Sequence, residues 1–168
     1  MNDEWSSLPK LKIYAGLLTT SILNGFLYAF GGLIGTGGSK YNNVSKLNLT
    51  EKKDWENVQF KGFFPPTSEL ASFSISDSSL IIIFGGSTNQ GITNETYILN
   101  CISEKEPIWE KSQNLPSKVK FCFTSPPIFC KGNVFIFDSN GTFFVYSLAQ
   151  KIWKEKKMIE WNATKKIN

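Results

Sequence analysis

Two stretches of the chain repeat one pattern at a fixed spacing, and this repetition constrains the fold more than any single residue. In each stretch an apolar run ends in Phe-Gly-Gly, a polar loop and a second apolar run follow, and a tryptophan closes the unit. Gly32 and Gly86 are 54 positions apart, and so are Trp55 and Trp109. Self-similarity with a period of about 40 to 55 residues is typical of propellers and other repeat arrays.

A third copy of the pattern is degenerate. Residues 134–137 form an apolar run of the same kind, but Asp138-Ser139 follows it in place of the glycines, and a shortened loop leads to Trp153. Runs of this length, rich in β-branched and aromatic side chains, are typical of strands that are buried on both faces. A glycine pair after such a run indicates a tight bend or the close approach of another segment.

Each unit is expected to form a four-stranded antiparallel meander with strands a, b, c and d. Turn-forming residues separate strands a and b in all three units: Asn24-Gly25, then residues 77–79, then residues 131–133. Strand a is expected at 17–23, 69–76 and 124–130, strand b at 26–30, 80–84 and 134–137, and strand c at 44–49, 95–102 and 142–148. Strand d begins at each tryptophan.

These residues resemble the kelch repeat, the unit of kelch-type β-propellers. The resemblance spans about residues 9 to 157 and rests on the following repeat positions: Gly31, Gly32, Trp55, Gly85, Gly86, Tyr97, Trp109, Tyr146 and Trp153. It implies an all-β propeller segment within residues 1–157, with blades at about 13–60, 67–116 and 121–157 and a C-terminal tail at 158–168. It also implies that the chain binds other macromolecules, as kelch-type propellers commonly do, although a fold alone does not define a function.

The expected blades do not close a ring, because closed propellers have roughly four to eight blades and the pattern supplies three. Residues 4–8 are predicted to be an orphan d strand, since Trp5 and Leu8-Pro9 follow the same order as Trp109 and Leu115-Pro116. The outer faces of the first and third blades would then be interaction surfaces. They are expected to carry Leu17, Leu18, Phe143 and Val145.

Composition argues against nucleic-acid recognition and against catalysis. The formal net charge of +4 comes from lysine alone, and without arginine there is no bidentate donor for a guanine edge or a phosphate. The chain has no histidine, so neither a Ser-His-Asp nor a Cys-His arrangement is available. The glycine-rich loop at 31–38 precedes Ser39-Lys40, the reverse of the Walker order, and a strand is expected to follow it. We therefore expect no enzyme and no cofactor.

The expected compartment is the cytoplasm. Three cysteines without metal-ligand spacing are typical of buried thiols in a reducing environment. Five Asn-x-Ser/Thr sequons occur, but the start of the chain lacks the features of a signal peptide, so these asparagines are expected to stay unmodified. The stretch from Gly16 to Gly38 is uncharged over 23 positions, yet Asn24-Gly25 in its middle favours a strand pair over a membrane span.

The predicted function is a non-enzymatic protein–protein interaction module, a structural or adaptor subunit of a larger cytoplasmic, cytoskeletal or organellar assembly. Recognition is expected in the b–c and d–a loops at 33–42, 87–93 and 60–67. The last of these is unusually apolar, and its candidate partner contacts are Phe60, Phe63, Phe64, Pro65 and Pro66. Phe63 and Phe64 could instead cap the core of their own blade. The partner would be another protein or a multi-subunit complex, which we prefer, or a second copy that completes a six-bladed ring.

Two other functions remain as alternatives. One is the substrate-recognition part of a ubiquitin ligase, although no helical BTB or F-box segment is visible. The other is a propeller enzyme of the oxidase or sialidase kind that a partner chain completes.

Overall fold

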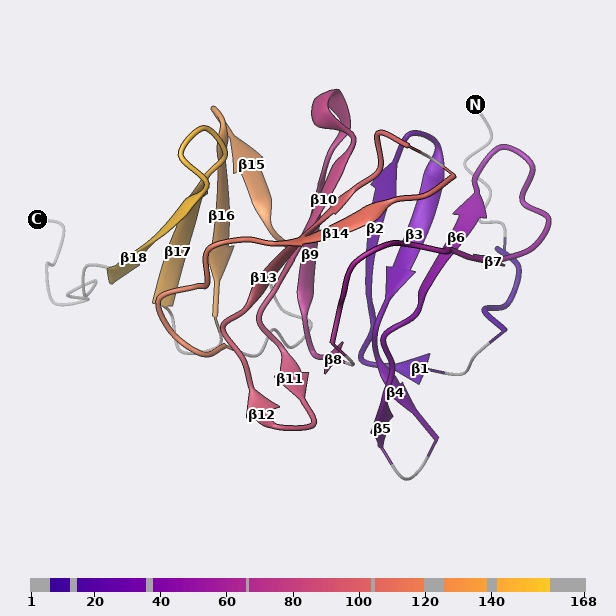
Figure 1. The fold of residues 1–168 in the computed structure, drawn as a ribbon, viewed down its shortest axis with the longest axis horizontal. Coiled ribbons are helices and arrows are strands. Elements are labelled where there is room, and N and C mark those ends of the chain that lie inside the picture. The colour runs from indigo at the N-terminus through magenta and orange to yellow at the C-terminus, as the bar shows by residue number, and fades with distance from the viewer. Residues whose placement is uncertain are drawn as a thin grey trace, which may run out of the picture.

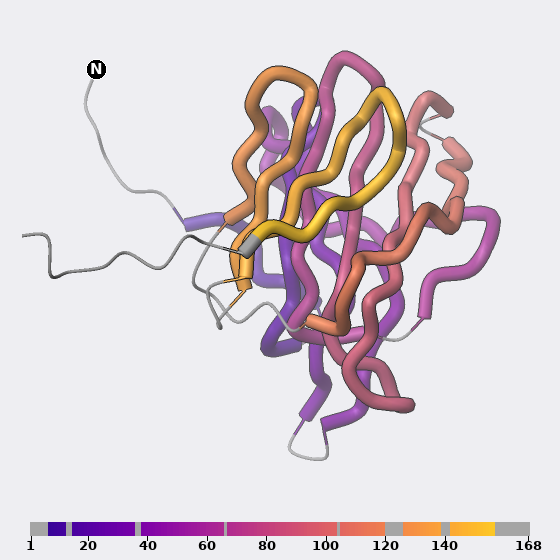
Figure 2. Tube along the Cα trace, turned by 90° about the vertical axis from the view of Figure 1, so that its left-hand side faces the viewer, coloured from indigo at the N-terminus to yellow at the C-terminus, as the bar shows by residue number. Residues whose placement is uncertain are grey.

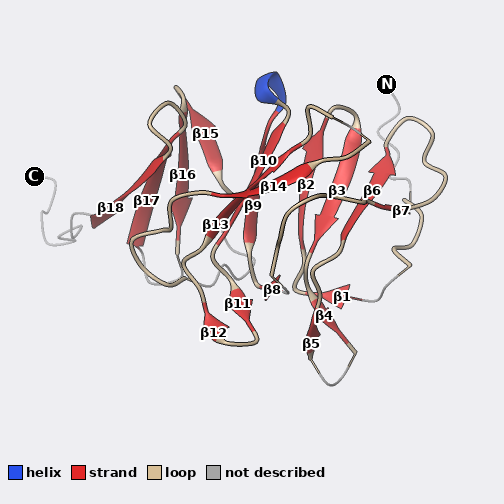
Figure 3. Ribbon diagram, viewed as in Figure 1, coloured by secondary structure: helices blue, strands red, loops and turns tan. Residues whose placement is uncertain are grey.

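Three four-stranded antiparallel sheets follow one another along the chain and stand side by side (Figure 1). The computed structural model describes residues 7–12, 15–35, 38–65, 67–103, 105–119, 126–138 and 142–157. Within these residues a single turn of 3-10 helix, η1 (Ser76–Ser78), interrupts the strands, and there is no α-helix (Figure 3). The expected all-β fold with three four-stranded blades is therefore confirmed.

Each blade is a simple meander, in which consecutive strands are neighbours in the sheet. Blade 1 consists of β2 (Thr19–Leu23), β3 (Phe26–Phe30), β6 (Val44–Asn48) and β7 (Glu56–Asn57). Blade 2 consists of β9 (Ala71–Ile75), β10 (Leu80–Phe84), β13 (Thr96–Asn100) and β14 (Ile108–Lys111). Blade 3 consists of β15 (Ile128–Cys130), β16 (Asn133–Phe137), β17 (Thr142–Ser147) and β18 (Ile152–Lys157). These four strands correspond to strands a to d of the sequence pattern.

Tight turns join the first two strands of every blade. Asn24 and Gly25 both have positive φ angles, 50° and 80°, as a two-residue hairpin of this type requires. In blade 3 Lys131 and Gly132 do the same, and in blade 2 Ser79 adopts the left-handed conformation after η1. The predicted turn residues thus act as expected.

Two short three-stranded sheets extend blades 1 and 2 at one end (Figure 1). The first contains β1 (Ala15–Gly16), β4 (Leu33–Ile34) and β5 (Ser39–Lys40), and the second contains β8 (Thr67–Ser68), β11 (Ser87–Thr88) and β12 (Gly91–Ile92). The sequence pattern predicted irregular b–c loops in place of β4, β5, β11 and β12, and it assigned no strand at β1 or β8, because strand a was expected to begin at Leu17 and Glu69. The glycine pairs bend the strand before β4 and before β11, and the facing strand breaks at Leu17 and Glu69, whose φ angles are also positive.

The glycine pairs lie where the backbone of β8 passes close to the bend. A Cβ atom on Gly31 would lie 2.2 Å from the carbonyl oxygen of Thr67, and one on Gly86 would lie 2.6 Å from that of Ser68. The second glycine of each pair also donates a backbone hydrogen bond toward the next blade, from Gly32 to Thr67 (2.9 Å) and from Gly86 to Val119 (2.7 Å). These positions therefore exclude any side chain.

The repeated tryptophans join neighbouring blades. The Trp109 ring of blade 2 lies 6.1 Å from Phe30 of blade 1, and the Trp153 ring of blade 3 lies 5.2 Å from Phe84 of blade 2. Trp55 has no earlier blade before it among the described residues. Instead its Nε1 donates to the carbonyl oxygen of Pro9 at 2.9 Å, and the indole is 8% exposed.

Two further expectations need correction. Tyr97 and Tyr146 are both expected repeat positions, but they are not equivalent, since Tyr146 lies opposite Trp153 in the sheet as Leu99 lies opposite Trp109. Of the predicted orphan strand at 4–8, Ser7 and Leu8 form no strand, and residues 4–6 lie outside the described part of the chain, as does the tail at 158–168.

The described residues contain no helix that is long and apolar enough to cross a membrane.

Candidate recognition pocket

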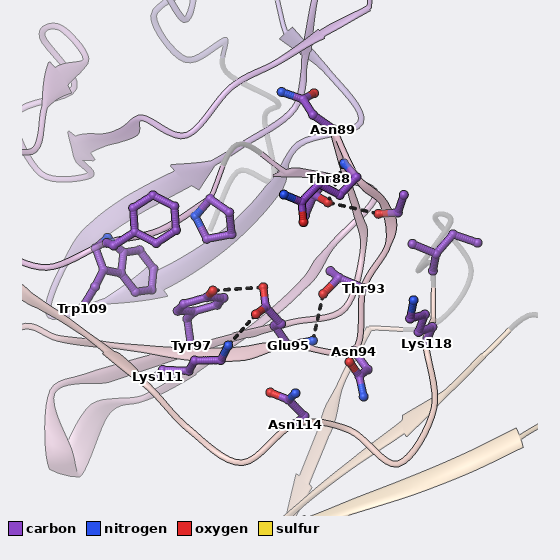
Figure 4. Close-up of a pocket in the computed structure, with 15 residues that line it drawn as sticks. Thr88, Asn89, Thr93, Asn94, Glu95, Tyr97, Trp109, Lys111, Asn114 and Lys118 are labelled. Carbon is purple, nitrogen blue, oxygen red and sulfur yellow. Dashed lines mark hydrogen bonds and ion pairs between the residues drawn. The ribbon is translucent and has the colours of Figure 1, made fainter.

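A pocket of about 790 Å³ opens beside blade 2, where two of the expected recognition loops meet (Figure 4). The b–c loop of blade 2 contributes residues 88–95, the connection between blades 1 and 2 contributes Phe63 and Pro65, and β14 contributes Trp109 and Lys111. Tyr97 of β13, together with Asn114 and Lys118, which follow β14, completes the lining. None of the described residues of the third expected loop, 33–35 and 38–42, lines this pocket.

Repeated side-chain hydrogen bonds hold the walls of the pocket in place. The Asn94 side-chain amide donates to the carbonyl oxygen of Leu115 at 2.9 Å, and Asn42 makes the same contact with Phe64 at 3.4 Å in the preceding blade. In both cases the asparagine precedes the third strand of a blade, and its acceptor precedes a proline. The b–c loop is therefore tied to the connection that leads into the next blade.

A carboxylate with two donors lies at the pocket wall. Lys111 Nζ hydrogen-bonds Oε1 of Glu95, and the Tyr97 hydroxyl donates to Oε2 at 3.0 Å (Figure 4). Burial raises the pKa of Glu95, but the hydrogen bonds from Lys111 and Tyr97 outweigh it, so the pKa is lowered overall. Burial, together with the bond to Glu95, raises the pKa of Tyr97 well above its ordinary value. Glu95 is therefore ionised and Tyr97 neutral near pH 7.

The five apolar residues that were predicted to contact a partner have different positions. Phe64 is buried, 2% exposed, and its ring stacks on Trp109 at 4.7 Å, so it caps the core of its blade, which is the alternative expectation for this residue. Phe60 is half-buried against the same indole. Phe63 is 66% exposed and lines the pocket with the half-buried Pro65. Pro66 lies outside the described residues.

The pocket offers many hydrogen-bonding groups and an apolar rim. Its polar lining is dominated by amides and hydroxyls from Thr88, Asn89, Gln90, Thr93 and Asn114. Such groups both donate and accept, and they match the main chain of a bound polypeptide. The described residues contain no cluster of His, Cys, Asp and Glu that could hold a metal ion.

Comparison with known proteins supports the fold and nothing finer. The chain is similar to the solved structure of YjhT, with a TM-score of 0.73 at 12% sequence identity. That structure has a β-propeller-like fold, and the match covers 94% of this chain and 56% of YjhT. This chain thus spans little more than half the length of the structure it matches. No protein-family model matches the sequence, and a search of curated proteins finds no match.

Sequence reasoning identified two loops of the pocket but not its polar groups. Glu95 and Lys111 are 16 residues apart, and only the pairing of β13 with β14 brings them together. The role of Asn94 could have been predicted, because Asn42 and Asn94 are 52 positions apart and each precedes strand c. The residues that accept their hydrogen bonds also repeat, in the Phe64-Pro65 and Leu115-Pro116 pairs.

Proposed function

We propose that this chain is a non-enzymatic kelch-type module that binds a partner protein as a structural or adaptor subunit of a cytoplasmic assembly. One observation carries the proposal: the exposed Phe63 and the b–c loop of blade 2, both expected to be recognition elements, line the same pocket. An exposed aromatic side chain at the rim of a polar pocket is a typical anchor for a protein partner.

An extended polypeptide segment is the ligand that fits this lining best. Asn89, Gln90 and Asn114 can pair with backbone N–H and C=O groups, while Phe63 and Pro65 provide an apolar surface for one side chain. The Glu95 carboxylate is already neutralised by Lys111, so it does not repel an acidic segment. Lys118 takes part in none of the ion pairs of the described residues and is available for a carboxylate.

The protonation states in the pocket favour binding over catalysis. A general acid or base works best when its pKa lies near the pH of the reaction. The pKa of Glu95 is lowered and that of Tyr97 is raised, so both groups move away from neutral pH.

A peptide-display experiment tests this proposal without a known partner. A phage-displayed library of random peptides is panned against the immobilised chain, and synthetic copies of the selected peptides are titrated by fluorescence polarisation. We expect Phe63→Ala to weaken their binding about tenfold or more, as the loss of an interface anchor does.

Ile102→Ala is the matched control. Ile102 is also a highly exposed apolar residue, 74% exposed, but it follows β13 at the end opposite to Glu95. Its substitution should leave peptide binding unchanged. The proposal is refuted if panning selects no peptide, or if the selected peptides bind the Phe63→Ala chain as well as the parent chain.

A further inference from the structure

Both contacts between blades join the same two kinds of face. On the side toward the following blade, blades 1 and 2 present Phe30 and Phe84 at the end of their second strands. On the side toward the preceding blade, blades 2 and 3 present Trp109 and Trp153. We call these the Phe face and the Trp face of a blade. Among the described residues, the Phe face of blade 3 and the Trp face of blade 1 lack this partner.

The Phe face of blade 3 carries three stacked phenylalanines that are only half-buried. Phe143 lies between Phe135 and Phe137, with ring centroids 5.9 Å and 5.1 Å away. Phe137 pairs with Phe143 in the sheet as Phe84 pairs with Thr96, so it occupies the position that receives a tryptophan in the other blades. A hollow of about 400 Å³ lies on this face, between Phe135, Val145 and Ile152. Figure 2 views the molecule from this side.

The Trp face of blade 1 is apolar in the same way. Leu47, Ala29 and Trp55 form its buried cluster, against which Leu11, Leu18 and Leu27 are partly buried. Ile22 pairs with Leu27 in the sheet and is 57% exposed. Residues 9–11 lie against this cluster and Trp55 is only 8% exposed, so the face offers aliphatic surface around Ile22 rather than the indole itself.

The first strands of the blades point to one specific contact. Phe73 of β9 and Phe129 of β15 lie 5.5 Å apart across the contact between blades 2 and 3. The sheet position of Phe73 is taken in blade 3 by Ile128, and the position of Phe129 is taken in blade 1 by Ile22. Ile128 is 55% exposed and Ile22 is 57% exposed. These two isoleucines would meet if blade 1 followed blade 3.

We propose that a second copy of this chain covers the Phe face of blade 3 with the Trp face of its blade 1. The contact is head-to-tail, and the reciprocal contact between the same two copies closes a two-fold ring. Two observations favour a second copy as the occupant. The chain itself carries both halves of the contact, and Ile22 and Ile128, the residues that would meet in it, are both more than half exposed. This inference does not depend on the recognition pocket.

Sedimentation equilibrium of the purified chain tests the inference. The chain has a mass of 18.9 kDa, and we expect twice that mass at tens of micromolar. Ile22→Glu and Ile128→Lys should each give monomers, because each places a charge in both contacts of the dimer. Both residues are more than half exposed in the single chain, so the variants should keep the β-type circular dichroism of the parent. Ile102→Glu, on neither face, is the matched control and should remain dimeric.

Mixing the Ile22→Glu and Ile128→Lys variants determines which faces meet. A mixed dimer has one contact without a substitution and one in which the introduced carboxylate of one copy faces the introduced ammonium of the other, so we expect the dimer mass to return. A monomeric parent chain would overturn the inference, and so would masses above the dimer. An Ile22→Glu variant that stays dimeric would also overturn it, because the dimer would then form without the Trp face of blade 1, for example through two Phe faces. If Ile128→Lys fails to fold, Ile152→Lys on the same face replaces it.

Discussion

Two buried indole nitrogens show how a single residue changes an otherwise repeated contact. Trp153 Nε1 donates to Thr96 Oγ1 at 3.0 Å, in the preceding blade. Trp109 Nε1 is buried without a hydrogen-bond partner among the described residues. Val44 pairs with Phe30 as Thr96 pairs with Phe84, so valine stands where the other contact has its acceptor. A buried polar group without a partner costs about 1–3 kcal/mol.

Val44→Thr should therefore stabilise the protein. The new hydroxyl takes the place of a methyl group in a fully buried position and can accept the Trp109 N–H, which should raise the free energy of unfolding by about 1 kcal/mol. Urea unfolding followed by fluorescence measures the change.

The control is Val44→Thr in a chain that also carries Trp109→Phe. Without the indole N–H the buried hydroxyl loses its donor, so Val44→Thr should then destabilise the chain. A destabilising effect of equal size in both backgrounds would show that the two side chains do not interact.

The bend between each long strand and its short continuation is the feature that organises the blades at the level of elements. It lets β10 end in the blade and β11 begin in the short sheet, with Gly85 and Gly86 at φ angles of 64° and 95°. The same bend in blade 1 brings the backbone of Gly32 to Thr67. One glycine pair thus ends a strand and connects it to the next blade.

Gly86→Ala should destabilise the chain more than Gly91→Ala. Both glycines have positive φ angles, 95° and 113°, which cost a side chain about 1–3 kcal/mol. Only at Gly86 would the new Cβ also crowd a carbonyl oxygen, that of Ser68 at 2.6 Å, whereas nothing lies within 4 Å of it at Gly91. Crowding of this kind adds about 1–3 kcal/mol. Thermal unfolding of both variants measures the difference, and equal losses would contradict the steric account.

The strands of the three blades were predictable from the sequence, but the two-residue strands of the short sheets were not. The apolar runs of β3, β10 and β16 are long enough to show both faces buried, and the tryptophans and glycines mark where the strands begin and end. The short sheets contain too few residues for a period to appear. The neighbouring Phe63 and Phe64 could not be told apart for a related reason, since their opposite exposures depend on where Trp109 lies in the next blade.

At the scale of the whole molecule, blade 2 is the only one of the three that other blades cover on both faces within the described residues. The cluster around Ile81 and Leu99 packs it against blade 1, and the cluster around Ile82 and Ile98 packs it against blade 3. Blades 1 and 3 each have one such contact and one face that, in our proposal, a second copy covers. The stability of the outer blades should therefore depend on protein concentration, and that of blade 2 much less.

Hydrogen exchange measured by mass spectrometry across a dilution series tests this account most directly. We predict that residues 80–84 and 96–100 of blade 2 exchange slowly at every concentration. Residues 133–137 and 142–147 of blade 3 should exchange slowly at tens of micromolar and faster once dilution separates the copies. Blade 3 protection that is independent of concentration, or exchange in blade 2 as fast as in the outer blades, would contradict the account.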